Sequence, residues 1–289
     1  MKKVIVGIGE ILWDMLPSGK ALGGAPANFA YHAGRLGGEG WAVSAVGDDA
    51  LGREILDLVA SKGLHSLIAA TDKPTGTVQV SLDERGVPTY NIMEDVAWDN
   101  IPFTADMEAR AKRADAVCFG SLVQRMASRD SVLRFVRSMR PDALKVFDIN
   151  LRQQFYTREV LEASFRRCDI LKINDEELVT ISRLYDIPGL SLEEKCWHIF
   201  DQYGLKMLIL TCGTNGSYVF HAGGMSYQVT PKVEVADTVG AGDSFTGSFI
   251  GSILQGRSVS VAHETAVKVS AYVCTQKGAM PVVPEELKG

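Results

Sequence analysis

Short, strongly apolar segments alternate with amphipathic helical patterns along most of this chain. The apolar segments are rich in branched and aromatic residues, and they cover Val4–Ile8, Ala42–Val46, Ala116–Phe119, Leu144–Asp148, Ile170–Ile173 and Met207–Leu210. Runs of this kind are typical of strands that are buried on both faces. Strands that alternate with helices predict an α/β fold, in which a mainly parallel sheet is covered by helices on both faces. We therefore expect one α/β domain over residues 1–289.

The segments between these runs carry helix signals. Apolar residues recur at helical spacing from Leu51 to Val59, and Gly63 stands where a helix C-cap is expected. Pro26 occupies the place of a first helical turn. Residues 191–194 read Ser-Leu-Glu-Glu, which is a capping box ahead of another helix. Helices are therefore expected on either side of the predicted strands.

Composition narrows the classes of protein that fit. Apolar residues make up 46% of the chain, its net charge is −5, and no basic stripe occurs, which argues against disorder and against a nucleic-acid groove. The N-terminal apolar run is too short for a signal peptide, and no run is long enough to cross a membrane, so we expect a cytoplasmic protein. An odd number of widely spaced cysteines argues against zinc sites and disulfides and predicts buried thiols: Cys118, Cys168, Cys196, Cys212 and Cys274.

Two stretches, Ile11–Leu22 and Thr77–Trp98, break the alternation of strands and helices. In the second, two alternating runs flank the turn residues Asp83–Pro88, which predicts a β-hairpin. A few strands inserted into an α/β domain are too small to form a core of their own. We expect them to form a lid, built from about residues 11–22 and 77–98, which would exclude water from a cleft.

Polar residues and glycines follow nearly every predicted core strand. Ligands of open α/β sheets bind beyond the carboxyl ends of the strands, so these residues mark the expected site. They are Gly9, Asp14, Gly47, Asp48, Asp148, Asn150, Asn174 and Gly213.

The segment Asp237–Phe245, which reads DTVGAGDSF, carries the strongest chemical signal. Its glycines permit a tight turn into the following helix, whose first amide groups would form an anion hole for a phosphoryl group. Asp243 would lie beside that hole and could accept a proton from an attacking hydroxyl. The simpler interpretation, that Asp243 only favours the helix dipole, does not account for the small residues before it.

This segment resembles the C-terminal signature of the ribokinase-like (PfkB) carbohydrate kinases. The N-terminal signature of that family resembles Gly23–Asn28, which Val46–Gly52 follows downstream. The resemblance extends over essentially the whole chain, with both signatures in the right order. It implies transfer of the γ-phosphoryl group of ATP, with Mg²⁺, to a sugar hydroxyl. It assigns the general base to Asp243, the anion hole to Gly240, Ala241 and Gly242, and sugar binding to Asp14, Gly24 and Asn28.

Further motifs of the family have matches whose structural interpretation stays open. Residues 174–177 resemble its N-x-x-E motif, in which Asn174 and Glu177 would help to place magnesium and phosphate, yet they also form a plain capping box. Thr211, Gly213 and Gly216 resemble its nucleotide loop or form an ordinary turn. Gly278 and Ala279 resemble its adenine-side loop or end a helix.

A monovalent cation such as K⁺ is a further implication of the resemblance. Asp237 and Val239 match the residues that hold it. At the far end of that site, however, Val282 stands where a small hydroxyl residue is common, which argues against potassium activation.

The substrate is expected to be a small sugar, first of all D-fructose. Gly9–Asp14 and Pro88–Asp99 resemble bacterial fructokinases of the family, and Trp13, Tyr90 and Trp98 could wall the sugar ring or simply form the core of the lid. Arg152 could bind hydroxyls or a carboxylate, which keeps 2-keto-3-deoxygluconate open, as are ribose and nucleosides.

Other classes of function fit less well. The GDSF sequence at Gly242 superficially resembles a serine hydrolase block, but no histidine lies three residues after an aspartate. A non-catalytic sugar sensor on the same fold remains as a distant alternative.

Exposed edges of the lid strands could pair two copies of the chain into a homodimer.

Overall fold

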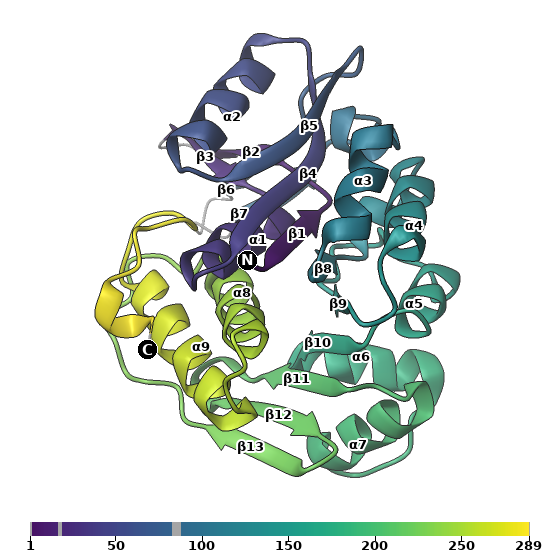
Figure 1. Ribbon diagram of the computed structural model, residues 1–289, viewed down its shortest axis with the longest axis vertical. Coiled ribbons are helices and arrows are strands. Elements are labelled where there is room, and N and C mark those ends of the chain that lie inside the picture. Colours follow the sequence, from purple (N-terminus) through teal and green to yellow (C-terminus); the bar gives the residue numbers. More distant parts are fainter. Residues whose placement is uncertain (1, 17–18, 83–87, 289) are drawn as a thin grey trace.

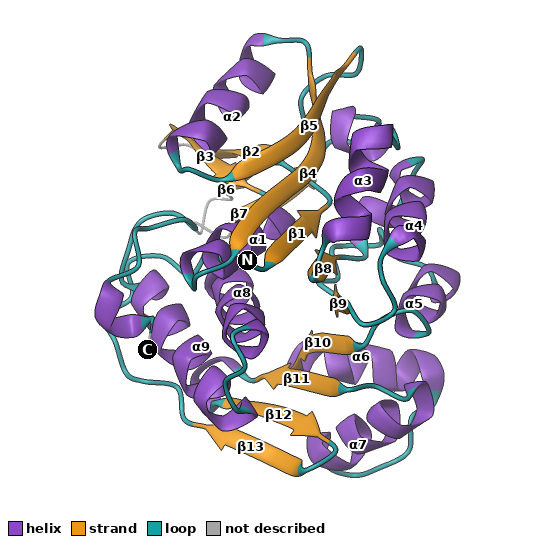
Figure 2. Ribbon diagram, viewed as in Figure 1, coloured by secondary structure: helices purple, strands orange, loops and turns teal. Residues whose placement is uncertain are grey.

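The computed structural model describes residues 2–16, 19–82 and 88–288. A large sheet runs through the molecule with helices on both sides, and a smaller sheet lies near one end of it (Figure 1). Figure 2 shows the strands of both sheets in orange and the surrounding helices in purple. The predicted α/β class, with a mainly parallel sheet and a small additional sheet, is confirmed.

The large sheet has the spatial order β13-β12-β11-β10-β9-β8-β1-β4-β5. Neighbouring strands are parallel from β5 to β11, whereas β12 pairs antiparallel with both of its neighbours, β11 and β13. The strands are β1 Val4–Ile8, β4 Glu39–Gly47, β5 His65–Thr71, β8 Ala116–Phe119, β9 Leu144–Asp148, β10 Ile170–Asn174, β11 Met207–Thr211, β12 Ser217–His221 and β13 Gly224–Gln228.

All six strands predicted from apolar runs are present, and β5, β12 and β13 were not predicted. These three contain mixed sequences, such as HSLIAAT in β5, and lie at or next to the two edges of the sheet. The edge strands β5 and β13 bury less of their surface than the central strands, so their sequences lack a continuous apolar run. The strand β12 is mostly buried, but its apolar run, Tyr218–Phe220, is only three residues long.

Helices cover both faces of this sheet and form two hydrophobic cores with it. One core includes side chains of α3 Ala105–Arg113, α4 Ser128–Ser138, α5 Arg158–Phe165, α6 Asp175–Tyr185 and α7 Leu192–Tyr203. The other includes side chains of α1 Ala25–Arg35, α2 Ala50–Ser61, α8 Ala241–Leu254 and α9 Val259–Cys274. Alternate residues of β1 enter the two cores, which confirms that such strands are buried on both faces. No helix in the described part of the chain is long and apolar enough to span a bilayer.

Short 3₁₀ turns complete the described elements. They are η1 Ala97–Asn100, η2 Leu122–Gln124, η3 Gly213–Asn215 and η4 Glu285–Leu287.

The small sheet is built from the two stretches that interrupt the alternation. Its order is β3-β2-β6-β7, with β3 Gly19–Gly23, β2 Leu12–Leu16, β6 Thr77–Leu82 and β7 Pro88–Ile92. The strands β6 and β7 pair antiparallel as expected for a hairpin, and the predicted turn residues 83–87 lie outside the described residues. Its own hydrophobic cluster is small and includes Leu122 of the large domain, in line with the expectation that it has no independent core.

Polar contacts, one of them a buried ion pair, attach the small sheet to the large domain. The guanidinium of Arg125 donates to both carboxylate oxygens of Asp99, at 2.8 and 2.7 Å, and one of its nitrogens also donates to the carbonyl of Met93. On the other side, Nε2 of Gln153 donates to the carbonyl oxygen of Tyr90 in β7 over 2.7 Å. Both links fix the small sheet beside the carboxyl ends of the central strands.

Helices α1 and α8 pack at unusually close range. A methyl group at Gly247 would lie 2.5 Å from the carbonyl oxygen of Phe29, and one at Gly251 would lie 2.8 Å from the Cβ of Leu36. The small residues of α8 therefore allow its close packing on α1. This contact fixes the start of α8 relative to the N-terminal half of the chain.

Candidate active site

A cleft opens at the carboxyl ends of the central strands, where the small sheet faces the start of α8. Its volume is about 1860 Å³. Pockets for one small ligand usually have about 300–1,000 Å³, so this cleft has room for two ligands side by side. Residues of the small sheet line one end, residues 211–217 and 229–239 line the other, and Asp243 lies among the lining residues.

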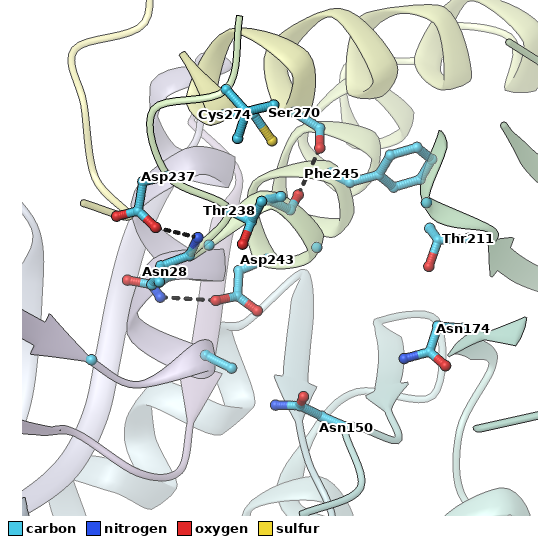
Figure 3. Close-up of a pocket in the computed structure, with 18 of the residues that line it drawn as sticks. Asn28, Asn150, Asn174, Thr211, Asp237, Thr238, Asp243, Phe245, Ser270 and Cys274 are labelled. Carbon is cyan, nitrogen blue, oxygen red and sulfur yellow. Dashed lines mark hydrogen bonds between the residues drawn. The ribbon is translucent and has the colours of Figure 1, made fainter. Parts of the chain in front are cut away.

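Asp243 lies in the first turn of α8 and points into the cleft beside Asn28 of α1 (Figure 3). Nδ2 of Asn28 donates a hydrogen bond of 2.8 Å to Oδ2 of Asp243. This bond leaves the other carboxylate oxygen of Asp243 for a ligand. The arrangement suits a general base, because its orientation is fixed and one acceptor atom faces the cleft.

The environment raises the pKa of Asp243 to about 6. Burial is the main cause, and the neighbouring carboxylate of Asp148 adds to it. The hydrogen bond from Asn28 and the positive charges of Lys172 and Arg152 act in the opposite direction. A carboxyl group with this pKa is ionised at neutral pH and is a stronger base than an ordinary aspartate.

The start of α8 offers amide groups to an anion. Gly240 adopts a left-handed conformation with φ 78°, which lets the chain turn directly into the helix. The amide of Ala241 donates to the carbonyl of Thr238 at 3.3 Å, whereas those of Gly242 and Asp243 have no acceptor among the described residues. Two free amides at a helix N-terminus favour a negatively charged group there.

The residues predicted to bind sugar lie together, with one exception. Asp14, Gly24, Asn28 and Arg152 all line the end of the cleft beside the small sheet. Gly24 has φ 124°, and a methyl group there would lie 2.4 Å from the carbonyl oxygen of Glu10, so glycine is required at this position. Burial raises the pKa of Asp14, and the charge of Arg152 partly offsets that effect.

Trp98 is the exception, and its predicted contact with the sugar is wrong. Its side chain is fully buried in the core of the small sheet, where it packs against Gly76, and it does not line the cleft. Trp13 is also buried, and its Nε1 donates to the carbonyl of Leu51. Of the three aromatic residues proposed as a wall, only Tyr90 lines the cleft, because the ring of Trp98 fills the small core of this sheet and the ring of Trp13 packs in the core that includes α1 and α8.

Most of the predicted nucleotide residues lie at the other end of the cleft. Thr211, Gly213 and Gly216 line it where β11 ends, and Asn174 and Gly278 line it from neighbouring loops. Figure 3 shows Asn174 and Thr211 across the cleft from Asp243. The structure also forms the turn that was the alternative interpretation, since Gly213 begins η3, Gly216 directly follows it, and both have positive φ.

Residues 174–177 form the capping box that the sequence suggested. The amide of Glu177 donates to Oδ1 of Asn174 at 2.8 Å, and Oε2 of Glu177 accepts from the amide of Asn174. Oε1 of Glu177 accepts from the amide of Leu151, so both its oxygens are already bonded. Asn174 reaches the cleft and the buried Glu177 does not, which limits Glu177 to an indirect role.

Asp237 and Ala279 hold neighbouring loops together. The carboxylate of Asp237 accepts from the amides of Val239 and Gly278, at 3.0 and 3.2 Å. Ala279 does not line the cleft: its methyl group lies against Gly240, and its carbonyl bonds to His32. The predicted contact of Ala279 with a nucleotide is therefore replaced by support of the turn before α8, because the residue is buried behind that turn.

The assignment of site residues from the sequence missed two charged residues, Glu10 and Lys172. Both line the cleft and are nearly fully buried. Burial raises the pKa of Glu10 to about 7, and its Oε2 has no hydrogen-bond partner among the described residues. The sequence did hold a signal for both residues. Lys172 lies within an apolar strand and Glu10 lies two residues after one, and an unpaired charge in such a buried position is costly.

No group of three or more His, Cys, Asp or Glu side chains suited to a metal ion occurs among the described residues. Oδ1 of Asp148 is buried beside Nζ of Lys172, at 3.3 Å, and Asn174 lines the cleft while its Oδ1 accepts from the amide of Glu177. Such a donor set fits magnesium that is bound mainly by phosphate oxygens and water.

Comparison with known proteins gives a consistent result. The model of a family described as "pfkB family carbohydrate kinase" matches residues 18–286. A relative named "Probable fructokinase-2" from Arabidopsis thaliana is 28% identical and aligns over 99% of this chain and 94% of its own length.

Two solved structures share the fold. Fructokinase with bound ATP from Xylella fastidiosa has a TM-score of 0.84 at 23% identity, covering 97% of this chain and 94% of that one. Fructokinase from Vibrio cholerae O395, with fructose, ADP and calcium, has a TM-score of 0.81 at 24% identity, covering 97% and 95%.

Proposed function

Because this chain belongs to the pfkB family of carbohydrate kinases, we propose that it transfers the γ-phosphoryl group of ATP to D-fructose, giving fructose 6-phosphate. The observation that carries the proposal is the position of Asp243. Its carboxylate faces a cleft with room for two ligands, next to the free amides of α8 and fixed by Asn28. These are the parts that phosphoryl transfer needs: an oriented base and a site for the charge of the phosphoryl group.

In this mechanism, the sugar binds near the small sheet and the nucleotide binds at the end formed by residues 211–217 and 229–239. Asp243 accepts the proton of the attacking hydroxyl while the new P–O bond forms and the bond to ADP breaks. The amides of Gly242 and Asp243 stabilise the negative charge on the phosphoryl oxygens. Magnesium bound with the nucleotide would neutralise phosphate charge, with Asn174 at the cleft and Glu177 holding Asn174 in place.

The small sheet is proposed to act as the lid over the sugar. Asp14 and Gly24 belong to this region or directly follow it, so closure would bring hydroxyl-binding groups and a water-excluding surface together. The exposed edges of the same sheet are the proposed contact between two copies of the chain. Sedimentation of the purified protein would test this contact.

Fructose is favoured over the other sugars by the relatives, several of which are named fructokinase. The specific alternative is 2-keto-3-deoxygluconate, because the exposed guanidinium of Arg152 lines the sugar end and, among the described residues, donates only to the adjacent carbonyl of Leu151. A free guanidinium suits a carboxylate. Ribose and nucleosides are less specific alternatives.

The test is ATP consumption by the purified protein with magnesium against fructose, ribose, 2-keto-3-deoxygluconate and nucleosides, in buffers with K⁺ or Na⁺. We expect turnover with fructose, and a rate lower by about 10²–10⁴-fold in the Asp243→Asn variant. A preference for another sugar would replace fructose and leave the kinase mechanism in place. Absence of turnover with every sugar, despite measurable sugar binding, would favour a non-catalytic sensor. Equal rates in K⁺ and Na⁺ would argue against a functional cation site at Asp237 and Val239.

A further inference from the structure

Lys172 is the one charged residue in the apolar strand β10, and it points toward the start of α8. Its neighbours Leu171 and Ile173 pack in the core that includes α3–α7, whereas Ile170 packs in the core that includes α8. Since alternate residues of a strand share a face, Lys172 lies on the α8 side. A methyl group at Gly242 would lie 3.4 Å from Nζ of Lys172, which places the ammonium beside the free amides of α8.

The ammonium of Lys172 has unused hydrogen-bonding capacity. Only 7% of the residue is exposed, and that part belongs to the cleft lining. Its one partner among the described residues is Oδ1 of Asp148, at 3.3 Å. An ammonium group has three donors, and leaving buried donors without acceptors is costly. The position is therefore suited to an anionic ligand that enters the cleft.

The surroundings keep this group charged. Burial tends to lower the pKa of Lys172, but the carboxylates of Asp148, Glu177 and Asp243 outweigh burial, and the net pKa lies above the ordinary value. These carboxylates favour the charged ammonium form of Lys172.

We propose that Lys172 is a catalytic residue that binds an oxygen of the transferring phosphoryl group, together with the amides of Gly242 and Asp243. The proposal rests on the proposed kinase function and adds a residue to it. During transfer, the bond between the γ-phosphorus and ADP breaks, the bond to the sugar oxygen forms, and the sugar proton moves to Asp243. Lys172 keeps its proton and stays bound to the phosphoryl oxygen throughout. Asp148 is the positioning residue that holds the ammonium in place.

The simpler interpretation is that Lys172 and Asp148 form an internal ion pair that only stabilises the fold. The two interpretations differ in nucleotide binding. A contact to the γ-phosphoryl group distinguishes a triphosphate from a diphosphate, and an internal ion pair does not.

The test compares binding of ADP and of the non-hydrolysable triphosphate AMP-PNP, both with magnesium and without sugar, by titration calorimetry. In Lys172→Met we expect AMP-PNP to bind about ten-fold more weakly or worse, and ADP to change by less than about two-fold. The matched control is Lys145→Met, which removes a lysine on the adjacent strand that pairs with Asp169 at 3.6 Å and does not line the cleft. It should leave both affinities unchanged.

Equal weakening of both nucleotides, or no weakening, would overturn the proposal. The double variant Lys172→Met/Asp148→Asn also removes the carboxylate that the single variant leaves unpaired. It replaces Lys172→Met in the test if that variant does not fold. We expect the double variant to show the same selective loss of AMP-PNP binding. If AMP-PNP binding recovers instead, the unpaired carboxylate of Asp148 causes the defect, and a contact by Lys172 is refuted. Lack of sugar-dependent turnover in the wild type would refute the sugar kinase function, while the two nucleotide affinities would still decide the role of Lys172.

Discussion

Nδ2 of Asn28 donates a 2.8 Å hydrogen bond to Oδ2 of Asp243, although the two residues are 215 positions apart in the chain. The bond joins the N-terminal signature of the family, at the start of α1, to its C-terminal signature, at the start of α8. The close packing of these helices at Gly247 and Gly251 makes the bond possible. The proposed base is therefore oriented by a residue of the proposed sugar-binding end.

Replacing the base should stop the reaction without removing the site. Asp243→Asn keeps an acceptor for Asn28 but cannot take a proton at neutral pH. Loss of a general base typically lowers kcat by about 10²–10⁴-fold, and we expect a decrease of this size, with sugar affinity within about three-fold of the wild type. Steady-state assays and sugar titrations would measure both. A kcat close to that of the wild type would show that another group accepts the proton.

The pH profile should report the ionisation of Asp243. Its raised pKa means that the active carboxylate form is present above about pH 6 and is lost as the pH falls through that value. We expect kcat/KM to fall about ten-fold per unit below the midpoint. Asn28→Ala removes a hydrogen bond that favours the ionised form, so the midpoint should move upward, by about one unit if the bond contributes about 1.4 kcal/mol. A downward shift would contradict this assignment.

Glu10 should make the fold less stable at alkaline pH. Its pKa rises from 4.5 to about 7 on folding, so the stability that its protonated form contributes is complete below about pH 4.5 and is lost as the pH rises through about 7. Glu10→Gln has no such loss. We expect the variant to be more stable than the wild type by up to about 3 kcal/mol at pH 8, and to differ little at pH 4.5.

Urea unfolding at both pH values would measure this difference. The control is Glu286→Gln, which replaces an exposed carboxylate near the C-terminus and should change stability little at either pH. If Glu10→Gln and the wild type have the same free energy of unfolding at pH 8, the ionisation of Glu10 does not destabilise the fold.

The contact between α1 and α8 should not tolerate an added methyl group. In Gly247→Ala the new methyl would meet the backbone carbonyl of Phe29 at 2.5 Å, and a helix backbone cannot easily move away. Overpacking of this kind costs about 1–3 kcal/mol, which opposes the gain of about 1 kcal/mol in helix propensity. We expect a lower midpoint of urea unfolding. Gly120→Ala is the control, since its methyl would have only an ordinary contact at 3.5 Å.

Much of the fold followed from patterns that are local in sequence. The apolar runs predicted all six central strands, and the capping box at Ser191 and Pro26 marked real helix starts. The edge strands β5 and β13 were not predicted because they are only partly buried, and β12 was not predicted because its apolar run is only three residues long. The residues next to Trp98 in the sequence likewise could not show whether its ring would face a ligand or a core, because distant segments of the chain surround that ring.

The sequence by itself determined the α/β class, the family and the segments that meet at the cleft, because periodicity and the two signatures are properties of neighbouring residues. Tertiary structure alone decided that Trp98 and Ala279 are buried away from the cleft and that Glu10 and Lys172 belong to it. It also joined Asn28 to Asp243. The physical reason is that burial, and with it the pKa and the bonding partners of a charged group, depends on side chains that are distant in sequence and meet only when the chain is packed.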